Sequence, residues 1–372
     1  MKRRVVAALS TIFKVEGGIP RFNQALCRAL DELAEEMGFE GRVLSQDDSR
    51  LDYERSGASW RRLEFVPGGD GPYRLSLRTA AECFRRRPDV LIVGLLGMTP
   101  LGLACRPLVR CGYGFVAYGT ESWHEPRLSR RIAARRAHLV FAVSNDTAAA
   151  LGRSTGVSPG RIRWLPGCLD PALERWASTA QAVRMDDAPE LLSVSRLWAE
   201  ELRKGVDHAI RAFARLAPRH PRARYRIVGK GSDKPRLQTL AASLGLGDRV
   251  IFEEGLSDRE LADRYRKCSI FVLPSGQEGF GIVYLEAMRF AKPCVGGCAG
   301  GAGEVIEDGR TGFLVGFLDP EGLEAALDRL LGDPGLRSRM GEAGRRRVEE
   351  TFTFDHFRGR LREGLAEWFS ST

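Results

Sequence analysis

The chain has 372 residues, of which 43% are hydrophobic and 28% are charged, a globular composition too long for one hydrophobic core. No apolar run approaches the ~20 residues that span a membrane. The apolar stretch after Arg4 is interrupted by Lys14 and Glu16 and lacks a cleavage site, which favours a buried strand over a signal peptide. The eight cysteines show no C-x-x-C spacing, so a metal site or a disulfide framework is disfavoured. We therefore expect two domains in a cytoplasmic protein.

The net charge of +9 is unevenly distributed. Residues 1–172 carry 26 Lys and Arg against 18 Asp and Glu, and the remainder carries 31 against 30. This asymmetry indicates an anionic partner on the first half, such as a lipid surface, a phosphorylated acceptor or nucleic acid. Nucleic acid is disfavoured because no known binding motif is present.

Strand and helix patterns alternate along the first half, which is typical of a parallel sheet covered on both faces. The predicted strands are residues 3–9, 41–45, 63–66, 90–93, 115–118, 139–143 and 162–165. Residues 46–62 show no regular pattern. A glycine pair, Gly17-Gly18, follows the first strand, where it would let the backbone approach a ligand or simply form a tight turn.

The alternation restarts after residues 172–189, which lack periodicity. Further strands are predicted at 191–195, 225–228, 250–252 and 270–273, and Asp-Pro pairs at 319–320 and 333–334 open two late helices. The predicted organisation is an N-terminal domain (1–172), a linker (173–189), a C-terminal domain (190–354) and a final helix (355–372). Each domain would be Rossmann-like, with ligands at the carboxyl ends of its strands.

Residues 275–287, Ser-Gly-Gln-Glu-Gly-Phe-Gly-Ile-Val-Tyr-Leu-Glu-Ala, read as a glycine-rich turn and a helix after a buried strand. The free N–H groups of such a helix start suit phosphate or sugar hydroxyls, although the same pattern is common as plain structure. Eight residues of helix span ~12 Å, so Glu278 and Glu286 are too far apart to share a proton. We expect them to hold opposite ends of an elongated ligand.

Other strand ends of the second half supply further candidates. Arg196 and Lys204 would suit a diphosphate, although a solvated basic loop is the plain alternative. Gly229 permits close approach of the backbone, and Gly255-Leu256 could present backbone to a flat base. Together these residues describe a nucleotide-diphosphate site.

These motifs resemble the retaining family 4 glycosyltransferases of GT-B architecture. The resemblance rests on Ser195-Arg196-Leu197, Lys204-Gly205, Val228-Gly229-Lys230-Gly231, Glu278-Gly279-Phe280-Gly281, Leu285-Glu286-Ala287, Gly300-Gly301 and Asp308-Gly309. It is dense from about 190 to 350 and thinner before 170. It implies two Rossmann-like domains facing across a cleft, with the C-terminal helix returning to the first domain.

The resemblance also implies roles for individual residues. Arg196 and Lys204 would bind the donor diphosphate, Glu278 would hold the donor sugar, and Glu286 the ribose. Gly17 and Gly18 would close on the phosphates, and Tyr118 and Glu121 would lie on the acceptor or sugar side. The donor-binding residues are completed by Gly229, Gly255, Leu256, Gly279, Phe280, Gly281 and Ile282.

Two positions depart from the family pattern. Many relatives have His-Gly where this chain has Tyr118-Gly119, which leaves a donor-sugar contact in question, and Pro166-Gly167 lacks the usual intervening asparagine. The chain contains no Asp-x-Asp, so we expect neither a metal nor a cofactor.

The expected activity is transfer of a sugar from a UDP- or GDP-sugar to an acceptor hydroxyl on a glycan or lipid-linked acceptor, with retention of configuration. The alternatives are a non-catalytic sugar-nucleotide-binding subunit and a Rossmann dehydrogenase, although Gly17-Gly18-Ile19-Pro20 does not supply G-x-G-x-x-G. In relatives that build lipid-linked glycans, basic segments such as 127–136 and Arg85–Arg87 can rest on an anionic membrane. Two interpretations of these segments stay open: peripheral contact with the inner face of an anionic membrane, and a plain arginine-rich surface.

Overall fold

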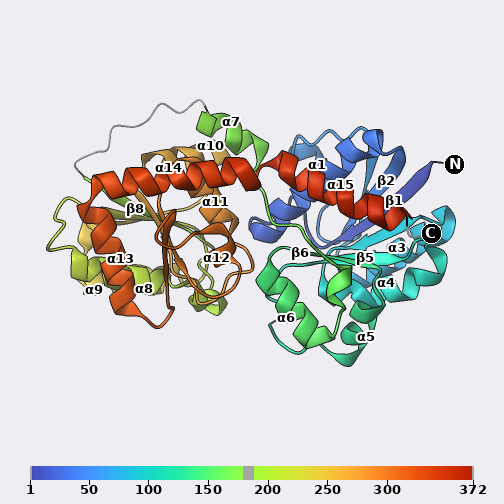
Figure 1. Cartoon of the computed structure of the whole chain (residues 1–372), viewed down its shortest axis with the longest axis horizontal. Coiled ribbons are helices and arrows are strands. Elements are labelled where there is room, and N and C mark those ends of the chain that lie inside the picture. The colour runs from blue at the N-terminus through green and yellow to red at the C-terminus, as the bar shows by residue number, and fades with distance from the viewer. Residues whose placement is uncertain (1, 122, 179–187, 371–372) are drawn as a thin grey trace. The chain divides into compact units, whose positions relative to one another are not determined.

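The computed structural model describes residues 2–121, 123–178 and 188–370. It divides into two compact units, one of Met1–Cys168 with Phe354–Thr372 and the other of Leu169–Thr353 (Figure 1). Of the predicted linker, residues 179–187 lie outside the described part. Residues just before them form a helix, α7 (Pro171–Ser178), where the sequence indicated no regular structure.

The first unit is a seven-stranded parallel sheet in the order β3-β2-β1-β4-β5-β6-β7. Its strands are β1 (Arg3–Leu9), β2 (Phe39–Ser45), β3 (Leu63–Pro67), β4 (Val90–Val93), β5 (Tyr113–Ala117), β6 (Leu139–Ala142) and β7 (Ile162–Trp164). Its helices are α1 (Gly18–Glu36), α2 (Arg50–Arg55), α3 (Pro72–Arg86), η1 (Leu96–Met98), α4 (Thr99–Cys105), η2 (Arg106–Leu108), α5 (Leu128–Arg136), α6 (Asn145–Thr155), η3 (Pro159–Arg161) and α15 (Phe354–Ser370).

The strand order runs in one direction from β1 to β3 and in the other from β4 to β7. Because right-handed crossovers in opposite directions along a sheet lie on opposite sides, helices cover both faces. Helices α3, α4, α5 and α6 pack in succession on one face, and α1 packs against α15. Figure 1 shows α15 beside α1. The Phe22 and Phe357 rings meet edge to face at 5.2 Å, and Trp368 donates a hydrogen bond to the Cys111 carbonyl at 2.8 Å. These contacts confirm that the C-terminal helix belongs to the first domain.

Two local expectations for the first unit are corrected. Residues 46–62 contain α2, which begins with a capping box between Ser49 and Asp52. Its six residues make fewer than two turns, which is too short for the apolar periodicity that reveals longer helices. Strand β5 begins at Tyr113, two residues before the predicted start, and the buried Tyr113 hydroxyl donates to the Ala133 carbonyl. Gly114 within β5 weakened the strand pattern, but a Cβ there would collide with Trp368.

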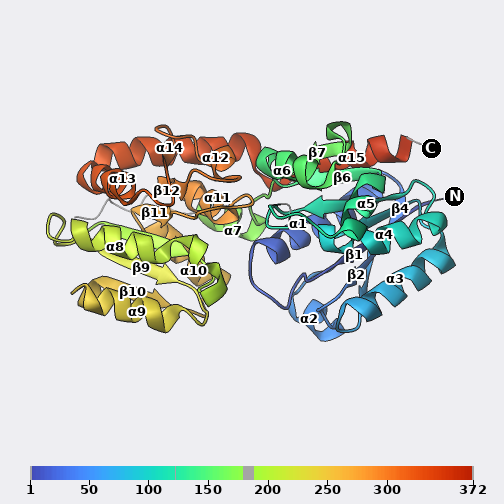
Figure 2. The same ribbon diagram turned by 90° about the horizontal axis from the view of Figure 1, so that it is seen from below.

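The second unit is a six-stranded parallel sheet in the order β10-β9-β8-β11-β12-β13 (Figure 2). Its strands are β8 (Glu190–Val194), β9 (Arg224–Val228), β10 (Val250–Glu253), β11 (Ile270–Leu273), β12 (Cys294–Gly297) and β13 (Gly312–Val315). With α7, its helices are η4 (Ala199–Lys204), α8 (Val206–Leu216), α9 (Lys234–Ser243), η5 (Gly247–Arg249), α10 (Asp258–Lys267), α11 (Ile282–Arg289), α12 (Ala302–Val305), α13 (Pro320–Gly332) and α14 (Pro334–Thr351).

The strand order of this unit reverses between β8 and β11, so the two strands that flank the switch point are neighbours. Helix α8 packs with α9 and α13, whereas α11 packs with α14 and α7. Ligands of open α/β sheets bind outside the carboxyl ends of the strands at such a point. The loops after β8 and β11 carry Arg196, Lys204 and Glu278.

Candidate active site

The loop after β8 is held by close backbone contacts that require glycine. The N–H of Ser195 donates to the Val228 carbonyl at 3.0 Å, and the N–H of Leu197 donates to Lys230 at 2.9 Å. A Cβ on Gly229 would lie 1.8 Å from the Ser195 carbonyl oxygen, closer than any real contact. Gly229 is therefore required for close packing, because only glycine lets the loop after β9 contact the loop after β8 at the sheet edge.

Lys204 and Glu278 form the central pair of the site. They are 74 residues apart in sequence, yet Lys204 Nζ lies 2.8 Å from Glu278 Oε2. Their side chains are only 18% and 15% exposed. The two loops are also joined by a hydrogen bond from the Gly276 N–H to the Arg203 carbonyl at 2.7 Å. The lysine and the carboxylate therefore neutralise each other at the switch point.

Gly300 and Gly301 shape the loop that carries Glu278. The N–H of Gly301 donates to the Glu278 carbonyl at 2.7 Å, and Glu278 and Gly300 form a parallel β-bridge. Gly300 has a φ of +83°, and a Cβ there would lie 2.2 Å from the Glu278 carbonyl oxygen. Both the backbone conformation and the contact exclude a side chain, so this glycine pair fixes where Glu278 lies.

Gly281 caps the start of helix α11, and its φ of 95° favours glycine. Tyr284 ties the helix to β11 through a hydrogen bond from its buried hydroxyl to the Leu273 carbonyl at 2.6 Å. Phe280 packs against Phe352 with ring centroids 5.7 Å apart. The N–H groups of Ile282 and Val283 precede the first hydrogen bond of this helix, from the Tyr284 N–H to the Gly281 carbonyl at 3.0 Å, and they lie at the positive end of the helix dipole. This end of α11 lies directly after the turn that bears Glu278.

Glu286 lies within the same helix and is 7% exposed. Its Oε2 accepts a hydrogen bond from the Tyr265 hydroxyl at 2.6 Å, and Tyr265 itself stacks on Phe290 at 6.1 Å. Sequence reasoning missed Tyr265, because it lies on α10 and nothing local ties it to Glu286. The tyrosine hydroxyl thereby helps to orient the carboxylate, and the contact of Glu286 with the ribose stays a prediction.

Arg196 is placed differently from Lys204. Its Nη2 lies 2.6 Å from Glu201 Oε1, and its side chain is 49% exposed. A pocket of about 10 Å³ is lined by both Arg196 and Lys204, which is room for roughly one water. Glu201 is a second residue that sequence reasoning missed.

Gly255 and Leu256 follow β10 as predicted, at the far edge of the same sheet. Gly255 is exposed with a φ of +69°, and Leu256 is half-buried. The structure thus brings Arg196, Lys204 and Glu278 to one edge with the start of α11. The role of Gly255-Leu256 as a base platform stays a prediction.

The predicted residues of the first unit follow the carboxyl ends of its strands. The buried Tyr118 hydroxyl donates to Asn23 Oδ1 at 2.8 Å. Glu121 accepts a hydrogen bond from the Leu96 N–H at 3.1 Å, and burial raises its pKa to about 7, against the lowering effect of that hydrogen bond. The acceptor-side or sugar-side roles of Tyr118 and Glu121 stay predictions.

The loop that ends at Gly17-Gly18 is ordered by Asp48, another residue that sequence reasoning missed. The 2% exposed Asp48 carboxylate accepts hydrogen bonds from the N–H groups of Ile12, Phe13 and Lys14 at 2.6, 2.8 and 2.7 Å. Gly17 has a φ of 147° and precedes α1. Gly18 has open space around it. Closure of this loop on donor phosphates stays a prediction.

Among the described residues, no group of three or more His, Cys, Asp or Glu side chains could hold a metal ion. Over the same residues, no helix has the length and apolar character to cross a membrane.

Two parallel α/β units, with a lysine–glutamate pair and a glycine-bounded helix start at one switch point, define a GT-B fold. Residues 17–168 match the glycosyl transferase 4-like domain, and residues 174–347 match the glycosyl transferases group 1. A GDP-mannose-dependent alpha-(1-6)-phosphatidylinositol monomannoside mannosyltransferase of Mycolicibacterium smegmatis is 34% identical over 265 residues, 68% of each chain. The chain therefore belongs to the family 4 glycosyltransferases.

Other similarities are of two kinds. A D-inositol 3-phosphate glycosyltransferase of Acidothermus cellulolyticus is 36% identical over 57% of this chain and 50% of that protein, so the chain matches about half the length of this relative. Sucrose-phosphate synthase from Thermosynechococcus elongatus superimposes with a TM-score of 0.80 over 100% of both chains at 20% identity. HepE from Anabaena, in complex with UDP and glucose, gives 0.79 over 98% of this chain and 99% of that one at 19% identity. These two structures support the fold.

Proposed function

We propose that the protein transfers a sugar from a UDP- or GDP-sugar to an acceptor hydroxyl, with retention of anomeric configuration, in the synthesis of a polysaccharide or glycolipid. The observation that carries this proposal is the Lys204–Glu278 pair, 2.8 Å apart, beside the start of α11. A cation held at a helix N-terminus suits a leaving diphosphate. A carboxylate beside it suits sugar hydroxyls.

In the proposed reaction the bond between C1 of the sugar and the diphosphate oxygen breaks, and a bond from C1 to the acceptor oxygen forms on the same face. Lys204 and Arg196 would stabilise the negative charge that develops on the diphosphate. The acceptor proton would pass to the leaving diphosphate. Glu278, released from Lys204, would accept hydrogen bonds from the sugar, and Glu286 would accept them from the ribose. No metal or cofactor takes part in this scheme.

A thermal-shift screen of UDP-, GDP- and ADP-sugars tests the donor assignment, because a ligand of the native state raises the melting temperature. Both nucleotides deserve a place in it, since the relative from M. smegmatis is named for GDP-mannose and the HepE structure holds UDP. Turnover in the presence of EDTA should equal turnover without it. The absence of any shift at millimolar concentration would refute the donor class, and a shift without turnover would favour a non-catalytic sugar-nucleotide-binding subunit.

The expected contact with an anionic membrane has a candidate surface on α3. Tyr73, Leu77 and Phe84 are 86%, 73% and 65% exposed. Their spacing of four and seven residues places them on one face of the helix. Arg74 and Arg85 lie beside this face. Exposed aromatic and leucine side chains flanked by arginines suit the interface of an anionic bilayer. They support our proposal that the protein contacts the cytoplasmic face of a membrane peripherally.

Sedimentation with vesicles tests this contact. Vesicles containing phosphatidylglycerol should bind the protein, and vesicles of phosphatidylcholine should not. Leu77→Asp should reduce binding about tenfold or more, because burying a charge at the interface is unfavourable. Leu318→Asp is the matched control, since Leu318 is 85% exposed in the second unit. Equal loss in both variants would contradict the assignment to α3.

A further inference from the structure

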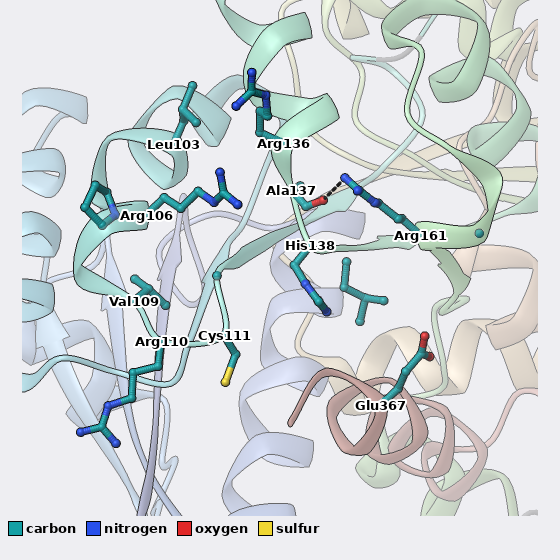
Figure 3. A pocket seen from close by; sticks show the side chains of 14 residues that line it. Leu103, Arg106, Val109, Arg110, Cys111, Arg136, Ala137, His138, Arg161 and Glu367 are labelled. Atoms are coloured by element: carbon teal, nitrogen blue, oxygen red, sulfur yellow. Dashed lines mark hydrogen bonds between the residues drawn. The ribbon is translucent and has the colours of Figure 1, made fainter. Parts of the chain in front are cut away.

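The first unit contains a cavity of about 890 Å³ that the proposed reaction does not use (Figure 3). It lies at the amino ends of β5, β6 and β7, where Gly112, His138 and Arg161 immediately precede the three strands. Tyr118 and Glu121 follow the other end of β5. A five-residue strand spans ~17 Å, so the cavity lies at the opposite edge of the sheet from those residues.

Arginines dominate the charge of this cavity. Arg106, Arg110, Arg136 and Arg161 line it, with Glu367 as the only acidic residue among the lining side chains. Glu367 is held by Arg163, whose Nε lies 2.8 Å from its Oε2. The negative charge of Glu367 is thus neutralised by Arg163, which does not line the cavity, and not by the four lining arginines.

The four arginines differ in their partners. Arg161 donates to the carbonyls of Arg135 and Ala137 at 2.9 and 3.2 Å. Arg110 lies 3.6 Å from Asp89 and points away from the others in Figure 3. Arg106 and Arg136 are exposed, and neither pairs with a carboxylate in the described part of the chain.

Figure 3 shows the guanidinium groups of Arg106 and Arg161 approaching Ala137 from opposite sides, with Arg136 beyond them. His138 lies between these arginines and Glu367 and stacks on Trp368 at 5.8 Å. The pKa of His138 is lowered by burial first, and then by the nearby charges of Arg161 and Arg106, against the opposing effect of Glu367. The lowered pKa of His138 reflects in part the positive charge that Arg161 and Arg106 contribute to this cavity.

We propose that this cavity binds a ligand bearing a phosphate or diphosphate group, held by Arg106, Arg136 and Arg161. Like charges gathered in a concave site repel one another and concentrate anions. Guanidinium groups match phosphate oxygens bidentately. The cavity volume lies within the range of small-molecule sites, which accommodates a soluble phosphorylated metabolite or the headgroup of a phospholipid.

Binding of inorganic pyrophosphate by isothermal titration calorimetry, at fixed ionic strength, tests the site in the full chain. The titration is made in the Lys204→Gln variant, so that the proposed donor site contributes little. Arg106→Gln/Arg136→Gln in that background should weaken binding at least ~10-fold, because hydrogen bonds between two charged groups are stronger than those between neutral groups. Both arginines are exposed, so the fold should survive.

The matched control is Arg153→Gln/Arg211→Gln, which removes two exposed arginines elsewhere and should leave the affinity unchanged. A second arm measures sedimentation with vesicles containing phosphatidic acid. If vesicle binding falls in the cavity variant and not in the control, the ligand is a lipid headgroup. If only pyrophosphate binding falls, the ligand is soluble. Equal affinity of the cavity and control variants in both arms, or no binding at millimolar pyrophosphate, would overturn the proposal.

Discussion

Lys204→Ala tests whether the lysine at the switch point stabilises the departing diphosphate. Lys204 Nζ lies 2.8 Å from Glu278 Oε2, and both side chains are largely shielded from water. Removing one donor to developing negative charge lowers kcat by about 10²–10³, or ~3–4 kcal/mol. Loss of the partner of a partly buried carboxylate should also destabilise the fold, by on the order of 1–3 kcal/mol.

The structure predicts that these two effects are coupled. Without Lys204, the unpaired Glu278 carboxylate would repel the incoming diphosphate, so part of the loss in donor affinity should be electrostatic. Glu278→Gln added to Lys204→Ala should therefore recover some donor affinity, although not the rate. A double-mutant cycle separates the two terms.

The assay follows release of the nucleoside diphosphate, with the donor identified by thermal shift, and unfolding is monitored in parallel. Lys267→Ala is the matched control, because Lys267 pairs with Asp263 at 2.6 Å on α10, before the amino end of β11. The control should retain full kcat. If Lys204→Ala kept kcat within about threefold of wild type while its donor affinity was unchanged, the diphosphate role of Lys204 would be wrong.

Three further predictions follow from the geometry. Tyr265→Phe should raise the donor Kd about 5–30-fold with kcat little changed, because the Glu286 carboxylate loses a hydrogen bond that contributes ~1–2 kcal/mol; unchanged Kd would exclude an orienting role. Gly300→Ala, which combines a positive φ with a collision against the Glu278 carbonyl, should lower the melting temperature and weaken donor binding together, and a melting temperature equal to wild type would contradict the packing argument. Burial raises the pKa of Glu121 to about 7 from an ordinary value near 4.5, so its protonated form contributes stability that is full below pH ~4.5 and lost as pH rises through ~7. Relative to Glu121→Gln, the wild type should therefore lose stability across that range, and parallel profiles would refute the shift.

Much of the fold could be predicted because its determinants act over a few residues. The apolar run 270–273, the glycine turn after it and the helical spacing beyond Gly281 all lie within one short stretch, and they form β11 and α11 as expected. Asp319 and Asp333, each followed by proline, begin α13 and α14 in the same way. Caps and periodicity are local properties, so a sequence is enough to reveal them.

Only the tertiary structure decided which charged and polar groups meet. Nothing near Lys204 indicates that its nitrogen contacts Glu278, and nothing near Glu286 indicates Tyr265 as its partner. Asp48 holds the glycine loop through three N–H groups more than 30 residues away. Through-space pairs depend on how strands are ordered in the sheet, and strand order is set by burial of whole elements against one another. The sequence alone thus indicated Arg196, Lys204, Glu278 and Glu286 as candidates. Packing within each sheet decided how they are held, and it added Tyr265, Glu201 and Asp48 as their neighbours or supports.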